Sequence, residues 1–162
     1  MADMEHAKEW LDYAQRDYDF AVDVESNFWP KHMEKICYFC QQSTEKALKA
    51  VLAYNEVSIP KTHNITELIE KCSKFDSSIQ MEEKVSIIMT AYATVSRYPD
   101  NVTSWNDDDA KLALKYAKST LEMIRKGNYS VAPSNLREKD EPNKASRIAI
   151  NAGTPCLRAV LI

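Results

Sequence analysis

Hydrophobic side chains recur at intervals of three and four residues along the first 127 residues, as they do on one side of an amphipathic helix. The pattern breaks at Trp29-Pro30, around Pro60 and at Tyr98-Pro99, because proline interrupts helical backbone. In the second segment the apolar positions form one broad side, which predicts a helix at the centre of a bundle. The expected helices span residues 4–25, 32–55, 64–75, 80–96 and 106–127.

Polar residues at the expected helix ends support these boundaries. Asn64 precedes the third segment and Glu67 follows three residues later, a spacing typical of an N-terminal capping box. The last segment opens on Asn106 with acids in its first turn and closes on bases before Gly127, which suits the helix dipole. The chain has only 2 glycines, Gly127 and Gly153, and they do not stand close enough together for a P-loop or a Rossmann fingerprint. The sequence therefore predicts an all-α protein.

Charge and composition narrow the class of protein further. Residues 1–128 carry 16 basic and 21 acidic side chains, so an extended interface with duplex DNA is disfavoured. No apolar run approaches the roughly 20 residues of a membrane-spanning helix, and the acidic, amphipathic N-terminal segment lacks the apolar stretch that a signal sequence needs. We expect a soluble, cytoplasmic protein with reduced cysteines. Residues 1–127 are the expected domain, and 128–162 a poorly ordered tail or a segment that orders on contact with a partner.

One run in the second segment carries a family resemblance. Residues 41–50, Gln-Gln-Ser-Thr-Glu-Lys-Ala-Leu-Lys-Ala, resemble the QQ-x-x-EK-A-x-KA helix of HEPN domains, the nucleotide-binding family of higher eukaryotes and prokaryotes. Pro60-Lys61-Thr62-His63, Arg97-Tyr98-Pro99-Asp100 and the closing helix follow in the expected order. The resemblance covers about residues 4–127. It implies an up-and-down bundle of four main helices with an additional short helix, commonly paired as a homodimer.

The resemblance also bears on activity, because the family includes ribonuclease toxins and domains encoded beside or fused to small nucleotidyltransferases. The family's ribonucleases carry an arginine followed, after four to six residues, by a histidine. No histidine follows Arg97 at that spacing, and the chain's histidines His6, His32 and His63 follow no other arginine in this way. We therefore expect a binding module and not an enzyme, with a nucleotidyltransferase-type protein as one partner. A ribonuclease with an unusual site, such as Arg97 with His63, and a purely structural dimerisation bundle are the alternatives.

Three groups of polar residues are the candidate ligand site. The second helix has a narrow polar stripe, the loop before the third helix offers a cation and an imidazole, and Arg97 with Tyr98 could contact a phosphate and a base. If the helices are neighbours, these groups form one cleft for a nucleotide of the ATP or GTP type, with RNA as an open alternative. The competing structural interpretations are that the loop residues only cap the third helix and that Arg97 and Tyr98 belong to a rigid turn. The candidate residues are Gln42, Glu45, Lys46, Lys49, Lys61, His63, Arg97, Tyr98 and Asp100.

Other chemistry-bearing patterns have simpler explanations. Cys37-x-x-Cys40 lies within an expected helix and has no second pair to complete a zinc site, so core packing is favoured. The run of aspartates at 107–109 suits a helix N-terminus without a metal. Trp10 and Tyr13, together with Tyr18, are expected in the core or at a dimer interface. The sequence thus predicts no metal and no cofactor.

Overall fold

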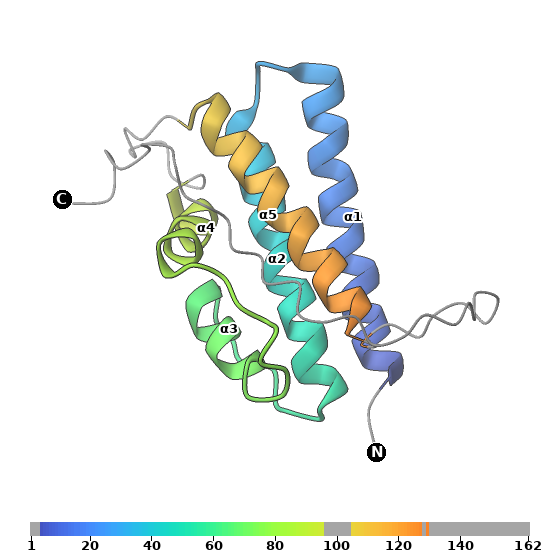
Figure 1. Ribbon diagram of the computed structural model, residues 1–162. Coiled ribbons are helices and arrows are strands. Elements are labelled where there is room, and N and C mark those ends of the chain that lie inside the picture. The colour runs from blue at the N-terminus through green and yellow to red at the C-terminus, as the bar shows by residue number, and fades with distance from the viewer. Residues whose placement is uncertain (1–3, 96–104, 128, 130–162) are drawn as a thin grey trace. The chain divides into compact units, whose positions relative to one another are not determined.

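The computed structural model describes residues 4–95, 105–127 and 129, which all lie in the first of the chain's two units, Met1–Val131. Every regular element in these residues is an α-helix, which confirms the all-α prediction (Figure 1). Four longer helices and one short helix form the bundle. They are α1 (Met4–Phe28), α2 (Met33–Tyr54), α3 (Ile65–Cys72), α4 (Glu83–Val95) and α5 (Asp107–Lys126).

Helix α2 is the centre of the bundle, as its broad apolar side predicts. It packs against each of the other four helices, while α3 and α4 pack against each other and α1 contacts α5. The side chains of α2 are buried almost continuously between residues 40 and 53. A helix surrounded in this way holds any polar side chain on its surface close to several neighbours. The position of α2 therefore explains how the candidate site is assembled.

Asparagine side chains cap two helix starts, and the cap at Asn64 is the predicted one. Asn64 Oδ1 accepts a hydrogen bond from the Glu67 backbone N–H at 3.2 Å. At the start of α5, Asn106 Oδ1 accepts from the Asp109 N–H at 3.1 Å, and Asp109 Oδ2 accepts from the Asn106 N–H at 3.0 Å. This reciprocal capping box satisfies amides that have no partner within the helix.

The middle helices are shorter than the sequence pattern indicates. The expected range 64–75 shrinks to Ile65–Cys72, and 80–96 becomes Glu83–Val95. Asp76 Oδ1 accepts hydrogen bonds from the backbone and hydroxyl of Ser78 at 2.9 and 2.6 Å. Aspartate that binds the backbone two residues later stabilises a turn in place of a helix. The α3–α4 connection is consequently longer than predicted.

Tyr129 connects the end of α5 to the rest of the domain. Its side chain is buried, and its ring meets that of Tyr54 edge-on with 5.2 Å between centroids. Its hydroxyl donates to Asp76 Oδ2 at 3.3 Å. The residue therefore links the chain after α5 to the end of α2 and to the α3–α4 connection. None of the described helices has the length and apolarity needed to cross a bilayer.

Candidate functional site

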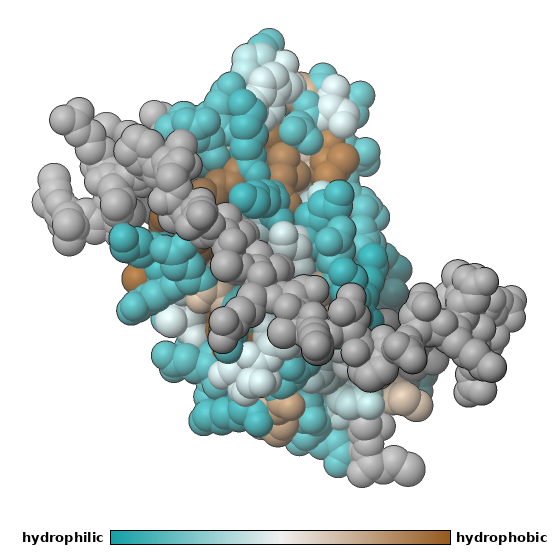
Figure 2. All heavy atoms as spheres, viewed as in Figure 1, coloured by the Kyte–Doolittle hydropathy of each residue, from teal (hydrophilic) through white to brown (hydrophobic). Residues whose placement is uncertain are grey.

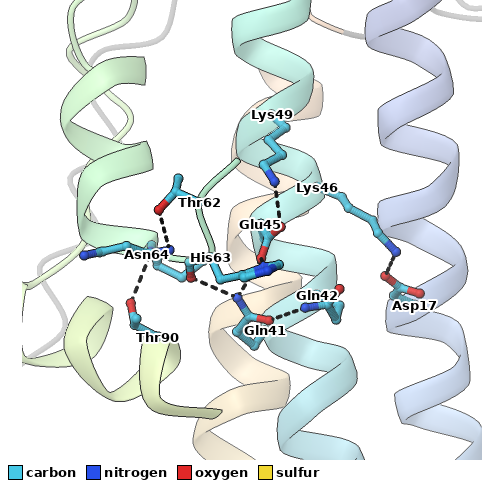
Figure 3. A network of polar contacts seen from close by, with 11 residues as sticks. Asp17, Gln41, Gln42, Glu45, Lys46, Lys49, Thr62, His63, Asn64 and Thr90 are labelled. Atoms are coloured by element: carbon cyan, nitrogen blue, oxygen red, sulfur yellow. Dashed lines mark hydrogen bonds and ion pairs between the residues drawn. The ribbon is translucent and has the colours of Figure 1, made fainter. Parts of the chain in front are cut away.

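In the polar stripe of α2, two side chains are buried and two are half-buried. Glu45 and Lys49 have only 4% and 7% of their surface exposed, whereas Gln42 and Lys46 are half-buried. Figure 3 shows Lys46 directed toward α1, and Glu45 on the part of α2 that meets the loop before α3. The stripe is therefore a set of contacts across α2 that joins its two neighbours.

Glu45 is the acceptor at the centre of this network. Lys49 Nζ donates to Oε1 at 2.7 Å, and Gln41 Nε2 donates to Oε2 at 3.0 Å. His63 Nδ1 lies 3.0 Å from the same Oε2. Because an ionised carboxylate can only accept hydrogen bonds, the proton of this contact belongs to His63 Nδ1. Glu45 thus occupies Nδ1 of His63 and leaves Nε2 for other partners.

The three donors hold Glu45 in its charged form although it is buried. Burial alone would raise the pKa of the carboxyl, because it disfavours the charge. The hydrogen bonds from Lys49, Gln41 and His63, together with the charge of Lys49, outweigh burial, and the pKa of Glu45 lies below its usual value. The buried part of the network is therefore an ion pair with almost no net charge.

His63 is the part of the network that reaches solvent. Its side chain is 59% exposed, although Nδ1 is bound to buried Glu45. Gln41 Nε2 also donates to the backbone carbonyl of His63 at 3.3 Å, so the residue is held by its backbone as well as its ring (Figure 3). Gln42 Nε2 in turn donates to Gln41 Oε1 at 2.6 Å. The imidazole is therefore presented to solvent in a fixed orientation.

The amides at the start of α3 are occupied by the protein itself. Thr90 Oγ1 accepts from the Ile65 N–H at 2.9 Å, and Thr62 Oγ1 accepts from the Asn64 N–H at 3.2 Å. Together with the Asn64 cap, these contacts leave few backbone donors for an anion at the helix N-terminus. A phosphate near this loop would have to bind to side chains, of which His63 and exposed Lys61 are the nearest in sequence.

On the other side of α2, the network continues onto α1. Lys46 Nζ forms an ion pair with Asp17 Oδ2 at 2.5 Å and lies 5.8 Å from the centre of the Tyr13 ring. Lys49 Nζ lies 5.7 Å from the centre of the Trp10 ring. Such distances allow cation–π attraction in addition to the ion pairs. Both lysines of the stripe are therefore oriented by α1.

Hydrogen bonds and ion pairs join four of the nine candidate residues, which are Gln42, Glu45, Lys49 and His63, whereas Lys46 pairs with Asp17 of α1. Lys61 is exposed in the same loop as His63. Arg97, Tyr98 and Asp100 lie outside the described residues, so the approach of Arg97 to this network stays a prediction. Tyr13, expected in the core or at an interface, is 48% exposed and is not a core residue.

Two members of the network were missed by sequence reasoning. Gln41 had a signal, because it precedes Glu45 by four residues and side chains at that spacing meet on one side of a helix. For Asp17, no signal in the sequence distinguishes it from the other acids of α1. Its partner Lys46 is 29 residues away in the chain, so only the packing of α1 on α2 identifies it.

The cysteine pair is part of the core. Cys37 and Cys40 are completely buried free thiols, and burial raises the pKa of each thiol. Within the described residues, no group of three or more His, Cys, Asp or Glu side chains is arranged to hold a metal ion. Core packing therefore explains the Cys-x-x-Cys spacing.

The helical order and the network around α2 define an all-α bundle with a polar contact region between its central helix and the loop before α3. The family model of the HEPN domain matches residues 7–127, and the chain belongs to the HEPN family.

Two solved structures share this fold. The crystal structure of TT1696 from Thermus thermophilus is similar with a TM-score of 0.62 and 20% identity. The structure of ST0689, an archaeal HEPN homologue, is similar with a TM-score of 0.56 and 21% identity. Each likeness covers 75% of this chain and 97% of the other. No curated protein matches the chain.

Proposed function

We propose that the chain is a nucleotide-binding HEPN module whose ligand binds at the solvent-facing edge of the α2 network. The observation that carries this proposal is the exposed imidazole of His63 bound to the buried carboxylate of Glu45. That carboxylate binds Nδ1 and so leaves Nε2 for a ligand, and a ring that carries a proton on each nitrogen donates Nε2–H to a phosphate oxygen. ATP or GTP is the expected class of ligand, as the family resemblance implies.

The charge balance of the network is compatible with an anion. Lys49 neutralises Glu45, and Lys46 neutralises Asp17, so the two buried or half-buried acids leave little negative charge at this edge. Lys61 adds an exposed cation in the loop that carries His63. An anion would therefore meet His63 and Lys61 without a facing unpaired carboxylate from the network. The amide of half-buried Gln42 offers a further polar contact.

Calorimetric titration with ATP, GTP and inorganic tripolyphosphate tests this proposal, and His63→Asn is the first variant. Loss of the imidazole should weaken binding about 10- to 150-fold, because a charge-assisted hydrogen bond contributes about 1.5–3 kcal/mol. His32→Asn is the matched control, since the His32 side chain is similarly exposed at 55% but lies at the start of α2. No binding by the unchanged protein, or equal loss in both variants, would exclude the proposed site.

A ribonuclease is the second candidate function, and one observation favours it. A histidine whose Nδ1 is bound to a buried carboxylate presents Nε2 as a base, the arrangement that many hydrolytic sites use to take a proton from a hydroxyl. Incubation of the purified protein with RNA distinguishes the candidates. Cleavage that disappears in His63→Ala and falls in Glu45→Gln would support the enzyme, whereas nucleotide binding without cleavage would support the binding module.

Pairing with a nucleotidyltransferase-type protein stays a prediction of the family resemblance. Co-expression with such a protein and co-purification at moderate salt would test it. Failure to co-purify would limit the proposal to the nucleotide.

A further inference from the structure

The 3 histidines of the chain differ in what holds their ring nitrogens. Exposure alone does not separate them, because the described surface visible in Figure 2 is mainly hydrophilic, with apolar patches. His6 Nε2 accepts a hydrogen bond from Trp10 Nε1 at 3.0 Å. His32 Nδ1 lies 3.8 Å from Glu34 Oε1, beyond hydrogen-bond distance, and both side chains are exposed. Among the three, only His63 combines an Nδ1 bound to a buried carboxylate with a ring that is 59% exposed.

The contacts of His63 leave Nε2 as the nitrogen that can react. The proton shared with Glu45 is on Nδ1, so Nε2 of the neutral ring carries a lone pair. Gln41 donates both to Glu45 Oε2 and to the backbone carbonyl of His63, which fixes these two residues relative to each other (Figure 3). Histidine with an accessible lone pair is one of the side chains that form covalent intermediates as nucleophiles. The structure therefore presents a nucleophile in a fixed orientation.

The surroundings of His63 are compatible with a group that adds negative charge. Lys49 pairs with Glu45 at 2.7 Å, so the carboxylate beside the ring is already neutralised. Lys61 is an exposed cation in the loop that carries His63. Both features favour a phosphoryl group over a cationic or apolar one, since the network itself offers no unpaired carboxylate to repel it.

We propose that His63 is a phosphoryl acceptor, modified at Nε2 by the γ-phosphoryl group of a nucleoside triphosphate bound with Mg²⁺. The lone pair of Nε2 attacks the γ-phosphorus, and an N–P bond forms while the bond from this phosphorus to the bridging oxygen breaks. The nucleoside diphosphate leaves with the electron pair of the broken bond. The Nδ1 proton stays between the ring and Glu45, which is thus a positioning residue.

This step rests on the proposed nucleotide binding, because that site supplies the donor. The ring that donates Nε2–H to a bound phosphate must first release that proton to solvent, and the neutral ring then reacts. Binding and transfer therefore use two protonation states of the same side chain. They can be measured separately.

Incubation with γ-labelled ATP and Mg²⁺ tests the transfer. An N–P bond survives base and is hydrolysed by acid, whereas phosphate esters of serine and tyrosine survive acid. We expect a base-stable, acid-labile label on the peptide that contains His63. It should disappear in His63→Asn and persist in His32→Asn, whose side chain is similarly exposed. Calorimetry on the same samples separates two failures, because ATP that binds without labelling His63 would overturn the inference and leave the binding function intact.

Potassium phosphoramidate tests the nucleophile without a nucleotide site, because this small donor phosphorylates histidine directly. The reaction is run in a protein with His6→Asn and His32→Asn, so that His63 is the one histidine left. Phosphorus NMR then identifies the modified nitrogen. Early in the reaction we expect the Nε2 product alone, since Nδ1 is bound to Glu45. Selective Nε2 labelling would support the acceptor even if ATP does not bind and the proposed function fails.

The variant Glu45→Met/Lys49→Met, in the same background, tests the positioning role of Glu45. It removes the Nδ1 acceptor together with its cation, so no buried charge is left unpaired. Circular dichroism checks that it is folded. We expect both the Nδ1 and the Nε2 product in this variant, a change that a general loss of stability would not cause. An Nδ1 product when Glu45 is present, or the same product ratio with and without Glu45, would overturn the inference.

Discussion

Replacing Lys49 by methionine should show how strongly the buried ion pair depends on both partners. The substitution keeps the length of the side chain but removes the donor at 2.7 Å from Glu45 Oε1, while Glu45 stays 4% exposed. Removing one partner of a buried pair costs about 3–5 kcal/mol, because it leaves an uncompensated charge. Gln41 and His63 still donate to Glu45 at 3.0 Å each. We therefore expect the free energy of unfolding to fall by about 2–3 kcal/mol, a smaller loss than for an isolated pair.

The loss of unfolding free energy in Lys49→Met should depend on pH in a defined direction. The pKa of Glu45 is lowered in the folded protein, so its stabilising contribution is present above the unfolded pKa of about 4.3 and is lost as the pH falls through the folded pKa. Without Lys49, the pKa of Glu45 should lie higher than in the unchanged protein, because only the hydrogen bonds from Gln41 and His63 then oppose the effect of burial. The difference between Lys49→Met and the unchanged protein should therefore shrink between pH 7 and about pH 4.

Urea unfolding followed by circular dichroism at both pH values measures these differences. Lys71→Met is the matched control, since Lys71 and Glu67 have the same four-residue spacing but lie 3.7 Å apart with 41% and 42% of their side chains exposed. It should cost less than about 0.5 kcal/mol. The double variant Glu45→Gln/Lys49→Met should recover most of the stability. A loss at Lys49 no larger than at Lys71, or a double variant as unstable as the single one, would refute the reasoning.

Three further changes test other parts of the fold. Asn106→Ala removes the cap of α5 and should cost about 1 kcal/mol in urea unfolding, while Asn106→Ser should restore most of it. Tyr129→Phe removes the hydrogen bond to Asp76 and should lower the free energy of unfolding by about 1 kcal/mol. Burial and Asp76 raise the pKa of Tyr129 to about 12, so the unchanged protein should lose stability as the pH rises from about 10 toward 12. The variant has no hydroxyl at this position and should lack this loss. Cys37 and Cys40 should resist iodoacetamide in the folded protein and react in urea, as mass spectrometry of the labelled peptides would show, because both thiols are buried with raised pKa values.

Sequence reasoning succeeded where the determining interactions are local. The apolar period identified the five helices of the described residues, since it reflects a helix geometry that repeats every few residues. The caps at Asn64 and Asn106 were predictable because each involves residues at most three positions apart. The shared side of Gln42, Glu45, Lys46 and Lys49 followed from the same spacing. Nothing in these arguments required knowledge of the neighbouring helices.

Tertiary structure decided which of these polar residues are buried and what they bind. Glu45 meets His63 across 18 residues of sequence, and Lys46 meets Asp17 across 29. Neither contact follows from helical period, because each depends on the path of a loop or the packing of α1 on α2. The stripe itself predicted a surface open to solvent or a ligand, whereas packing buried Glu45 with Lys49 and left His63 exposed. Local spacing thus determined which side chains share a face, and the arrangement of the helices determined their environment.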